Sequence, residues 1–167
     1  MASMYKVSIP VYIRRLNGLA ICLKKAHDQY ADKKFDESSL MGQRMFPDMF
    51  TFAKQVQAAT DHARASGARL AGMAPPTVEA NEKTLAELIA RVDSTVAFLG
   101  TIKPEQVDGS EDKTIAFKMR GNDVSYKGLD FLLNSNMPNF YFHMTTAYNI
   151  LRTNGVEVGK RDFMGPA

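Results

Sequence analysis

The sequence predicts an all-α fold: a four-helix bundle with a small β-hairpin inserted between the third and fourth helices. The chain has 167 residues, the size of one domain, so we expect a single domain over residues 1–167. Its composition, 45% hydrophobic and 23% charged, is that of an ordinary globular protein with a core. Four segments carry apolar residues at helical spacing, and one short segment alternates between apolar and polar residues.

The first predicted helix spans residues 9–33. Pro10 suits a first helical turn, and apolar residues from Tyr12 to Tyr30 recur every three or four positions. Residues 36–44 have mixed polarity and contain a glycine, so they are expected to form a connection.

The second predicted helix, residues 47–70, opens on a proline and stops before Gly72. Its polar residues lie on both sides of the apolar stripe. Gln57 and Asp61 are four residues apart and share one flank, whereas His62 lies on the opposite flank. Either flank can face a neighbouring helix.

The third predicted helix spans residues 82–100 and ends at a glycine that is soon followed by proline. The next apolar segment, residues 114–119, is rich in β-branched and aromatic residues. A Gly-Asn turn then leads into residues 124–126, which predicts an antiparallel hairpin. Because an isolated hairpin is marginal in water, we expect Phe117 or Tyr126 to anchor it on the helices.

Residues 128–134 are expected to form a short helical piece before the fourth helix, which runs from Pro138 to the cap at Gly155. His143 lies on the apolar stripe of this helix. The last twelve residues, 156–167, are judged too short for another element, although their apolar side chains predict that the tail docks on the bundle.

Charge and cysteine content indicate the cellular compartment and the classes of partner to expect. The net charge of +3 is too small to indicate a nucleic-acid partner, and no stretch approaches the roughly 20 apolar residues of a membrane helix. Arg14 and Arg15 interrupt any signal peptide, and the single Cys22 fits a reducing compartment. We therefore expect a cytoplasmic protein that has neither a nucleic-acid nor a membrane partner.

Several longer motifs carry a family resemblance. The motifs are Phe46-Pro47-Asp48-Met49-Phe50, Gln55-Val56-Gln57 with Asp61, Arg69-Leu70-Ala71-Gly72, Asn139-Phe140-Tyr141-Phe142-His143, Thr145-Thr146-Ala147-Tyr148, Ile150-Leu151-Arg152, Asn154-Gly155-Val156 and Gly159-Lys160-Arg161-Asp162-Phe163. With these motifs the sequence closely resembles the domain-of-unknown-function family nineteen-ninety-three, a branch of the DinB/YfiT-like superfamily, which contains metalloenzymes. The resemblance implies a DinB-like four-helix bundle, often a homodimer, and no established activity.

The resemblance also implies where a metal would lie. The superfamily is known for one histidine on the second helix and an H-x-x-x-H pair on the fourth, since histidines at i and i+4 share a helix face. His143 matches the first position of that pair, but Ala147 occupies the second. On the second helix Asp61 and His62 are both candidates. Two plausible ligands fall short of a catalytic zinc site, so we expect no cofactor and a pocket used without metal, or with a weakly held one.

Two classes of function stay open. In the first, Gln57, Asp61 and His143 line a small-molecule pocket between the second and fourth helices, and Asp61 orients the imidazole. In the second, the protein is a non-catalytic homodimeric interaction or structural module, and these polar groups fix helix register. The sequence contains no recognisable nucleophile motif beside His143, so whether a reaction is catalysed stays undecided at this stage.

Overall fold

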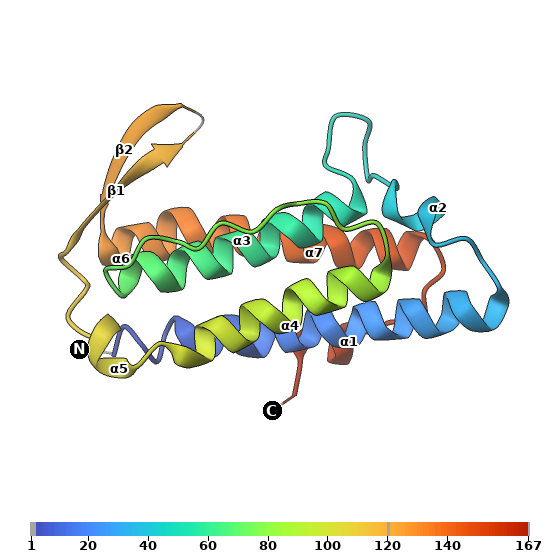
Figure 1. Ribbon diagram of the computed structural model, residues 1–167, viewed down its shortest axis with the longest axis horizontal. Helices are drawn as coiled ribbons and strands as arrows, with labels where there is room; N and C mark the ends of the chain where they lie inside the picture. Colours follow the sequence, from blue (N-terminus) through green and yellow to red (C-terminus); the bar gives the residue numbers. More distant parts are fainter. Residues whose placement is uncertain (1–2, 120, 167) are drawn as a thin grey trace.

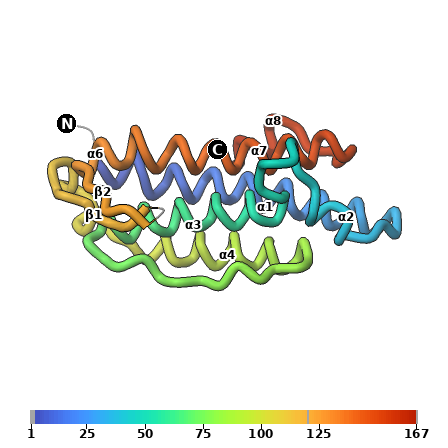
Figure 2. The backbone as a smooth tube through the Cα atoms, turned by 90° about the horizontal axis from the view of Figure 1, so that it is seen from above, coloured from blue at the N-terminus to red at the C-terminus, as the bar shows by residue number. Residues whose placement is uncertain are grey.

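The computed structural model describes residues 3–119 and 121–166 and confirms the all-α bundle with its inserted hairpin. The long helices are α1 (Ile9–Lys33), α3 (Phe52–Leu70), α4 (Leu85–Thr101) and α7 (Met137–Thr153). Helix α1 lies beside α4, and α3 lies beside α7 (Figure 1). Residues 72–84 run the length of the bundle on the outer side of α3 and α4, so these two helices point the same way (Figures 1 and 2).

The apolar stripes of the four helices meet in one core. Tyr12 of α1 and Phe140 of α7 are fully buried there, and their rings meet edge to face with centroids 5.0 Å apart. The Tyr12 hydroxyl donates a 2.7 Å hydrogen bond to Oδ1 of the buried Asn136. Because burial raises the pKa of Tyr12 far above its usual range, the phenol stays neutral and acts as a donor.

The second bundle helix starts five residues later than Pro47. It begins at Phe52, where the Thr51 hydroxyl accepts a 3.3 Å hydrogen bond from the N–H of Lys54 and caps the first turn. The chain before it forms a loop and a short helix, α2 (Ser38–Met41), which the sequence did not predict. Because the helix begins only at Phe52, residues 42–51 lie outside it and project from the bundle.

Helix α4 also starts later than expected, at Leu85 rather than at Glu82. Thr84 and Glu87 form a capping box, in which each side chain bonds the backbone of the other residue. Glu82 is therefore outside the helix, in the extended segment, and its carboxylate is available to bond to side chains of α3 and α4.

The hairpin consists of β1 (Thr114–Met119) and β2 (Asn122–Lys127), paired antiparallel as predicted. Phe117 anchors it, because its ring meets that of the buried Phe131 edge to face at 5.7 Å. After the hairpin come α6 (Gly128–Asp130) and a π-helical turn, η1 (Phe131–Asn136), which continues directly into α7.

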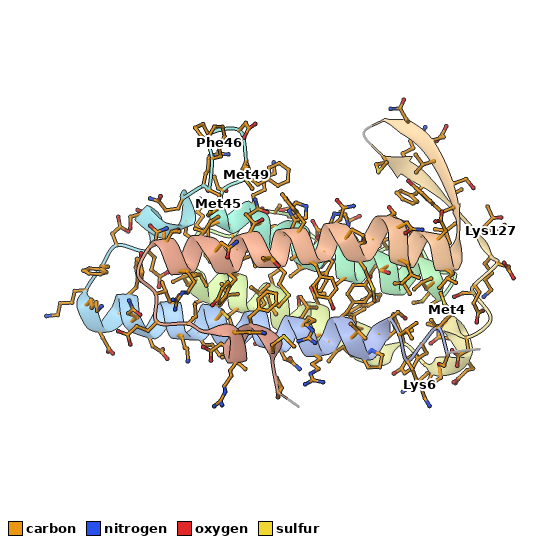
Figure 3. The ribbon with its side chains drawn as sticks, turned by 180° about the vertical axis from the view of Figure 1, so that it is seen from behind. Met4, Lys6, Met45, Phe46, Met49 and Lys127 are labelled. Carbon is orange, nitrogen blue, oxygen red and sulfur yellow. The ribbon has the colours of Figure 1, made fainter. Side chains whose placement is uncertain are left out.

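The hairpin and the loop of residues 42–51 project from the same side of the bundle, over opposite ends of α3 and α7 (Figure 1). Met45, Phe46 and Met49 lie in the outer part of that loop, and Phe46 is 64% exposed (Figure 3). The two projections therefore stand on either side of the surface that α3 and α7 share.

The tail does form another element, contrary to the expectation that it was too short. Helix α8 (Lys160–Met164) packs on α1, where Lys25 pairs with Asp162 at 2.9 Å. Phe163 meets the Tyr148 ring at 5.5 Å, so the predicted docking of the tail is confirmed. The prediction judged this segment by its length alone. The short helix is capped by Asp162, whose carboxylate accepts a hydrogen bond from the N–H of Gly159.

No helix in the described part of the chain combines the length and apolar character needed to cross a membrane. Cys22 is buried in α1, and burial raises the pKa of its thiol to about 12. The thiol is therefore protonated and unreactive at neutral pH.

The close approach of α8 to α1 depends on Gly18. A Cβ at this position would lie 2.5 Å from the carbonyl oxygen of Phe163, so Gly18→Ala should displace α8 and lower the free energy of unfolding by about 1 to 3 kcal/mol. The control is Gly100→Ala in α4, where the new methyl group meets nothing within 4 Å and should be neutral or stabilise by up to about 1 kcal/mol. Urea denaturation followed by circular dichroism measures both, and equal effects would contradict the packing role of Gly18.

Candidate functional site

A cavity of about 920 Å³ lies between α3 and α7, in the surface bounded by the loop of residues 42–51 and the hairpin. Its α3 wall is one stripe at spacings of three and four residues, which places these side chains on one face of the helix. The stripe consists of Gln55, Ala58, His62, Ala65 and Arg69. Opposite it, η1 and α7 contribute Phe131, Ser135, Asn136, Asn139, Phe142 and His143.

His143 is held in one orientation by Gln55. Its Nδ1 lies 2.7 Å from Oε1 of Gln55, while Nε2 of that amide donates to the carbonyl oxygen of Phe50 at 3.3 Å. Because the amide oxygen can only accept, Nδ1 of His143 carries the proton. Nε2 of the imidazole is then an unprotonated acceptor, and it has no hydrogen-bond partner among the described residues.

Two aromatic rings lie nearly parallel to this imidazole. The Phe50 and His62 rings both stack on His143, with centroid distances of 5.8 Å and 5.5 Å. Burial, the neighbouring His143 and Arg69 lower the pKa of His62 to about 4, and burial also lowers the pKa of His143. Both imidazoles are therefore neutral at pH 7, so they can exchange hydrogen bonds with a ligand at little electrostatic cost.

The other end of the cavity holds a cation. The guanidinium of Arg69 lies 4.0 Å above the Phe117 ring and 5.9 Å from the Phe131 ring. Burial lowers its pKa, although a guanidinium stays charged at neutral pH. The cavity therefore has neutral histidines at one end and a positive charge on aromatic rings at the other.

The structure places Gln57 and Asp61 on the opposite flank of α3, which faces α4 and not α7. Gln57 donates to Glu82 at 2.8 Å, and Oδ1 of Asp61 accepts hydrogen bonds from Arg64 and from Arg91, the latter at 2.7 Å. Asp61 borders the cavity, but Gln55 takes the role expected of it, since Gln55 orients His143. Of the three residues expected to line the pocket, Asp61 and His143 line the cavity and Gln57 does not, and Asp61 bonds Arg64 and Arg91 in place of His143.

Arg91 organises this flank. It is 3% exposed, and its guanidinium donates to the Thr60 hydroxyl, the Glu79 carbonyl, Glu82 and Asp61 over 2.7–2.8 Å. Burial alone would raise the pKa of Glu82, but the hydrogen bonds from Arg91 and Gln57 lower it, so the carboxylate stays charged. The network ties α3 and α4 to the extended segment between them.

The residues present do not fit the metal centre that the resemblance implies. Ala147 is fully buried in the core and offers no ligand atom. Asp61 is engaged by two arginines. Across residues 3–119 and 121–166, no group of three or more His, Cys, Asp or Glu side chains is placed to hold one ion. The cavity is lined by two histidines, Asp48 and the arginine-bound Asp61, and these side chains do not converge as the three protein ligands that a catalytic zinc needs.

Sequence reasoning missed Gln55 and Arg69 as cavity residues. The available signal was a second stripe: with Ala58, His62 and Ala65 they repeat at helical spacing beside the buried stripe, and the two alanines between polar residues leave open space. The pattern does not predict which neighbouring helix this stripe faces.

Acid should destabilise the protein through His62. Its pKa is about 6.5 when unfolded and about 4 when folded, so the unfolded state binds more protons between these values and stability falls as pH drops through that window. The contribution is at most about 3 kcal/mol. His62→Asn should flatten this part of the pH profile in urea denaturation.

The matched control is His27→Asn, which changes a histidine that pairs with Glu37 away from the cavity. This variant should keep the acid-dependent loss that His62 causes. A profile for His62→Asn as steep as that of the wild type would contradict the assignment.

Comparison with known proteins supports the architecture. The 1.83 Å crystal structure of a DinB family member protein from Shewanella denitrificans matches with a TM-score of 0.86 and 34% sequence identity, covering 98% of this chain and 92% of that chain. No curated protein matches the sequence. A family model described as Domain of unknown function (DUF1993) matches residues 4–164. The chain therefore belongs to the DUF1993 family, and its structure places it with the DinB-like bundles.

Proposed function

We propose that this protein binds a small organic molecule in the cavity between α3 and α7, without a resident metal ion, and that His143 is its main polar contact. The observation that carries the proposal is a neutral, oriented imidazole in the wall of a large cavity. Its volume of about 920 Å³ falls in the range of ligand pockets, which run from about 300 to 1,000 Å³.

The surroundings of His143 support a recognition role. The rings of Phe50 and His62 stack on the imidazole, and its Nε2 is left as the polar edge. A ligand hydroxyl, thiol or amide N–H can donate to this nitrogen. Since a neutral imidazole can also remove such a proton, the same geometry supports general base chemistry at neutral pH.

A ligand-driven melting screen of a metabolite collection tests the proposal, paired with Ala65→Leu. Ala65 lies in the cavity wall, so leucine should fill the space and abolish the melting shift of a hit compound. Ala97→Leu makes the same change at an exposed position of α4 and should leave the shift intact. Equal responses of the two variants would place the ligand outside the cavity.

His143 itself distinguishes a binding group from a structural one. If it serves the ligand, His143→Ala should remove the melting shift while costing less than about 1 kcal/mol in unfolding free energy. A loss of about 1 to 3 kcal/mol, from the orphaned Gln55, would favour a structural role. Elemental analysis of untagged protein completes the series, and one stoichiometric metal ion per chain would contradict the metal-free site.

The exposed apolar rim favours a second candidate function, a non-catalytic homodimeric interaction module. Phe46 and Phe142 are 64% and 54% exposed, and Phe142 meets the His143 ring at 5.3 Å. Exposed apolar patches of this kind often mark protein interfaces. Under this proposal sedimentation velocity should show a dimer for the wild type and a monomer for the double variant Phe46→Ser and Phe142→Ser. A wild-type protein that stays monomeric at high concentration would contradict the proposal.

A further inference from the structure

We propose that the ligand of this cavity is an anion: an elongated, mostly apolar molecule whose terminal oxyanion group pairs with Arg69. This inference rests on the proposed function and adds the chemical class of the ligand. It comes from the way Arg69 is held, the absence of a counter-charge beside it, and the spacing between it and the histidines.

The guanidinium of Arg69 is held by aromatic faces and not by hydrogen bonds. It lies 4.0 Å above Phe117, whose ring in turn rests on Phe131. The N–H donors of a guanidinium lie in its own plane, so a contact with an aromatic face leaves them able to bind a carboxylate or phosphate through two hydrogen bonds. Two aromatic contacts therefore orient the group and leave its donors available.

Arg69, which is half-buried, differs from the buried Arg64 and Arg91 of α3 and α4. Arg64 and Arg91 pair with carboxylates, whereas Arg69 makes no ion pair and no side-chain hydrogen bond within the described ranges 3–119 and 121–166. Arg69 is half-buried against the Phe117 ring, so part of its water shell is replaced by apolar atoms, and burial lowers its pKa. A partly desolvated cation without a carboxylate partner gains from an incoming anion.

The acidic residues of the cavity do not compete for this cation. Asp61 is already bonded to Arg64 and Arg91. Asp48 precedes the first turn of α3, whereas Arg69 lies in its last turn. At a rise of about 1.5 Å per residue, these two positions are separated by most of the length of the helix. The end of the cavity near the hairpin is therefore positive.

The helix spacing fixes the size of the ligand. His62 and Arg69 are seven residues apart on one face of α3, which corresponds to about 10 Å along the helix. Ala65 lies between them and leaves room for an apolar body. A molecule that reaches both ends thus carries an oxyanion at Arg69, an apolar framework on the order of 10 Å long beside α3, and a hydrogen-bond donor for Nε2 of His143, whose ring stacks on that of His62.

A pair of fluorescent probes isolates the charge. The dye 1-anilinonaphthalene-8-sulfonate is a flat apolar anion, and N-phenyl-1-naphthylamine is the same framework without the sulfonate. Arg69→Gln should weaken binding of the sulfonate about tenfold or more and change that of the neutral dye less than about twofold. The control Lys24→Gln removes an exposed charge from α1 and should alter neither affinity.

Three outcomes decide the matter. If Arg69→Gln leaves sulfonate binding unchanged, or weakens both dyes equally, the anion assignment is wrong although the pocket can stand. If Ala65→Leu affects neither dye, they bind outside the cavity, and both the proposed pocket and this inference fail.

Wild-type protein gives a readout that does not depend on folding of a variant. Added NaCl should lower the affinity for the sulfonate dye and leave the affinity for the neutral dye unchanged, because salt screens an ionic contact. An equal salt response of the two dyes would overturn the inference.

Discussion

The buried guanidinium of Arg91 is the constraint on which the site depends. A buried cation must be fully hydrogen-bonded, since leaving it without a carboxylate costs about 3 to 5 kcal/mol. Arg91 meets this need with Asp61 and Thr60 from α3 and with Glu82 and the Glu79 carbonyl from the extended segment. These bonds fix the rotation of α3 about its axis, with the Asp61 flank toward α4.

That rotation decides what faces α7. With the acidic flank turned toward α4, the opposite flank brings Gln55, His62 and Arg69 into the cavity wall. One side of α3 is consequently a set of mutually neutralised charges, whereas the other carries a cation with no acidic partner and neutral imidazoles. A single helix thus separates the charges that hold the fold from the groups available to a ligand.

The cavity also shows how one imidazole is positioned without a metal. The resemblance to the DinB-like superfamily implies a site in which a metal ion is coordinated by histidines of the second and fourth helices. In this chain Gln55 fixes the tautomer of His143 by a 2.7 Å hydrogen bond, and Phe50 and His62 restrain its plane by stacking. The position that would supply the second histidine of the pair is Ala147, whose methyl group fills the core instead. Hydrogen bonding and stacking therefore do the orienting that coordination would otherwise do.

The sequence by itself determined the fold class and the hairpin, because helical and alternating apolar periods and their Pro and Gly boundaries are local properties. It also located His143 on an inward stripe. It misplaced the starts of α3 and α4, since the capping bonds of Thr51 and Thr84 outweigh the proline and the first acidic residue. Only the tertiary structure decided that Gln55, and not Gln57 or Asp61, meets His143. Both flanks of α3 carry polar residues, and the one that faces α7 is chosen by the bonds of Arg91, a residue on another helix.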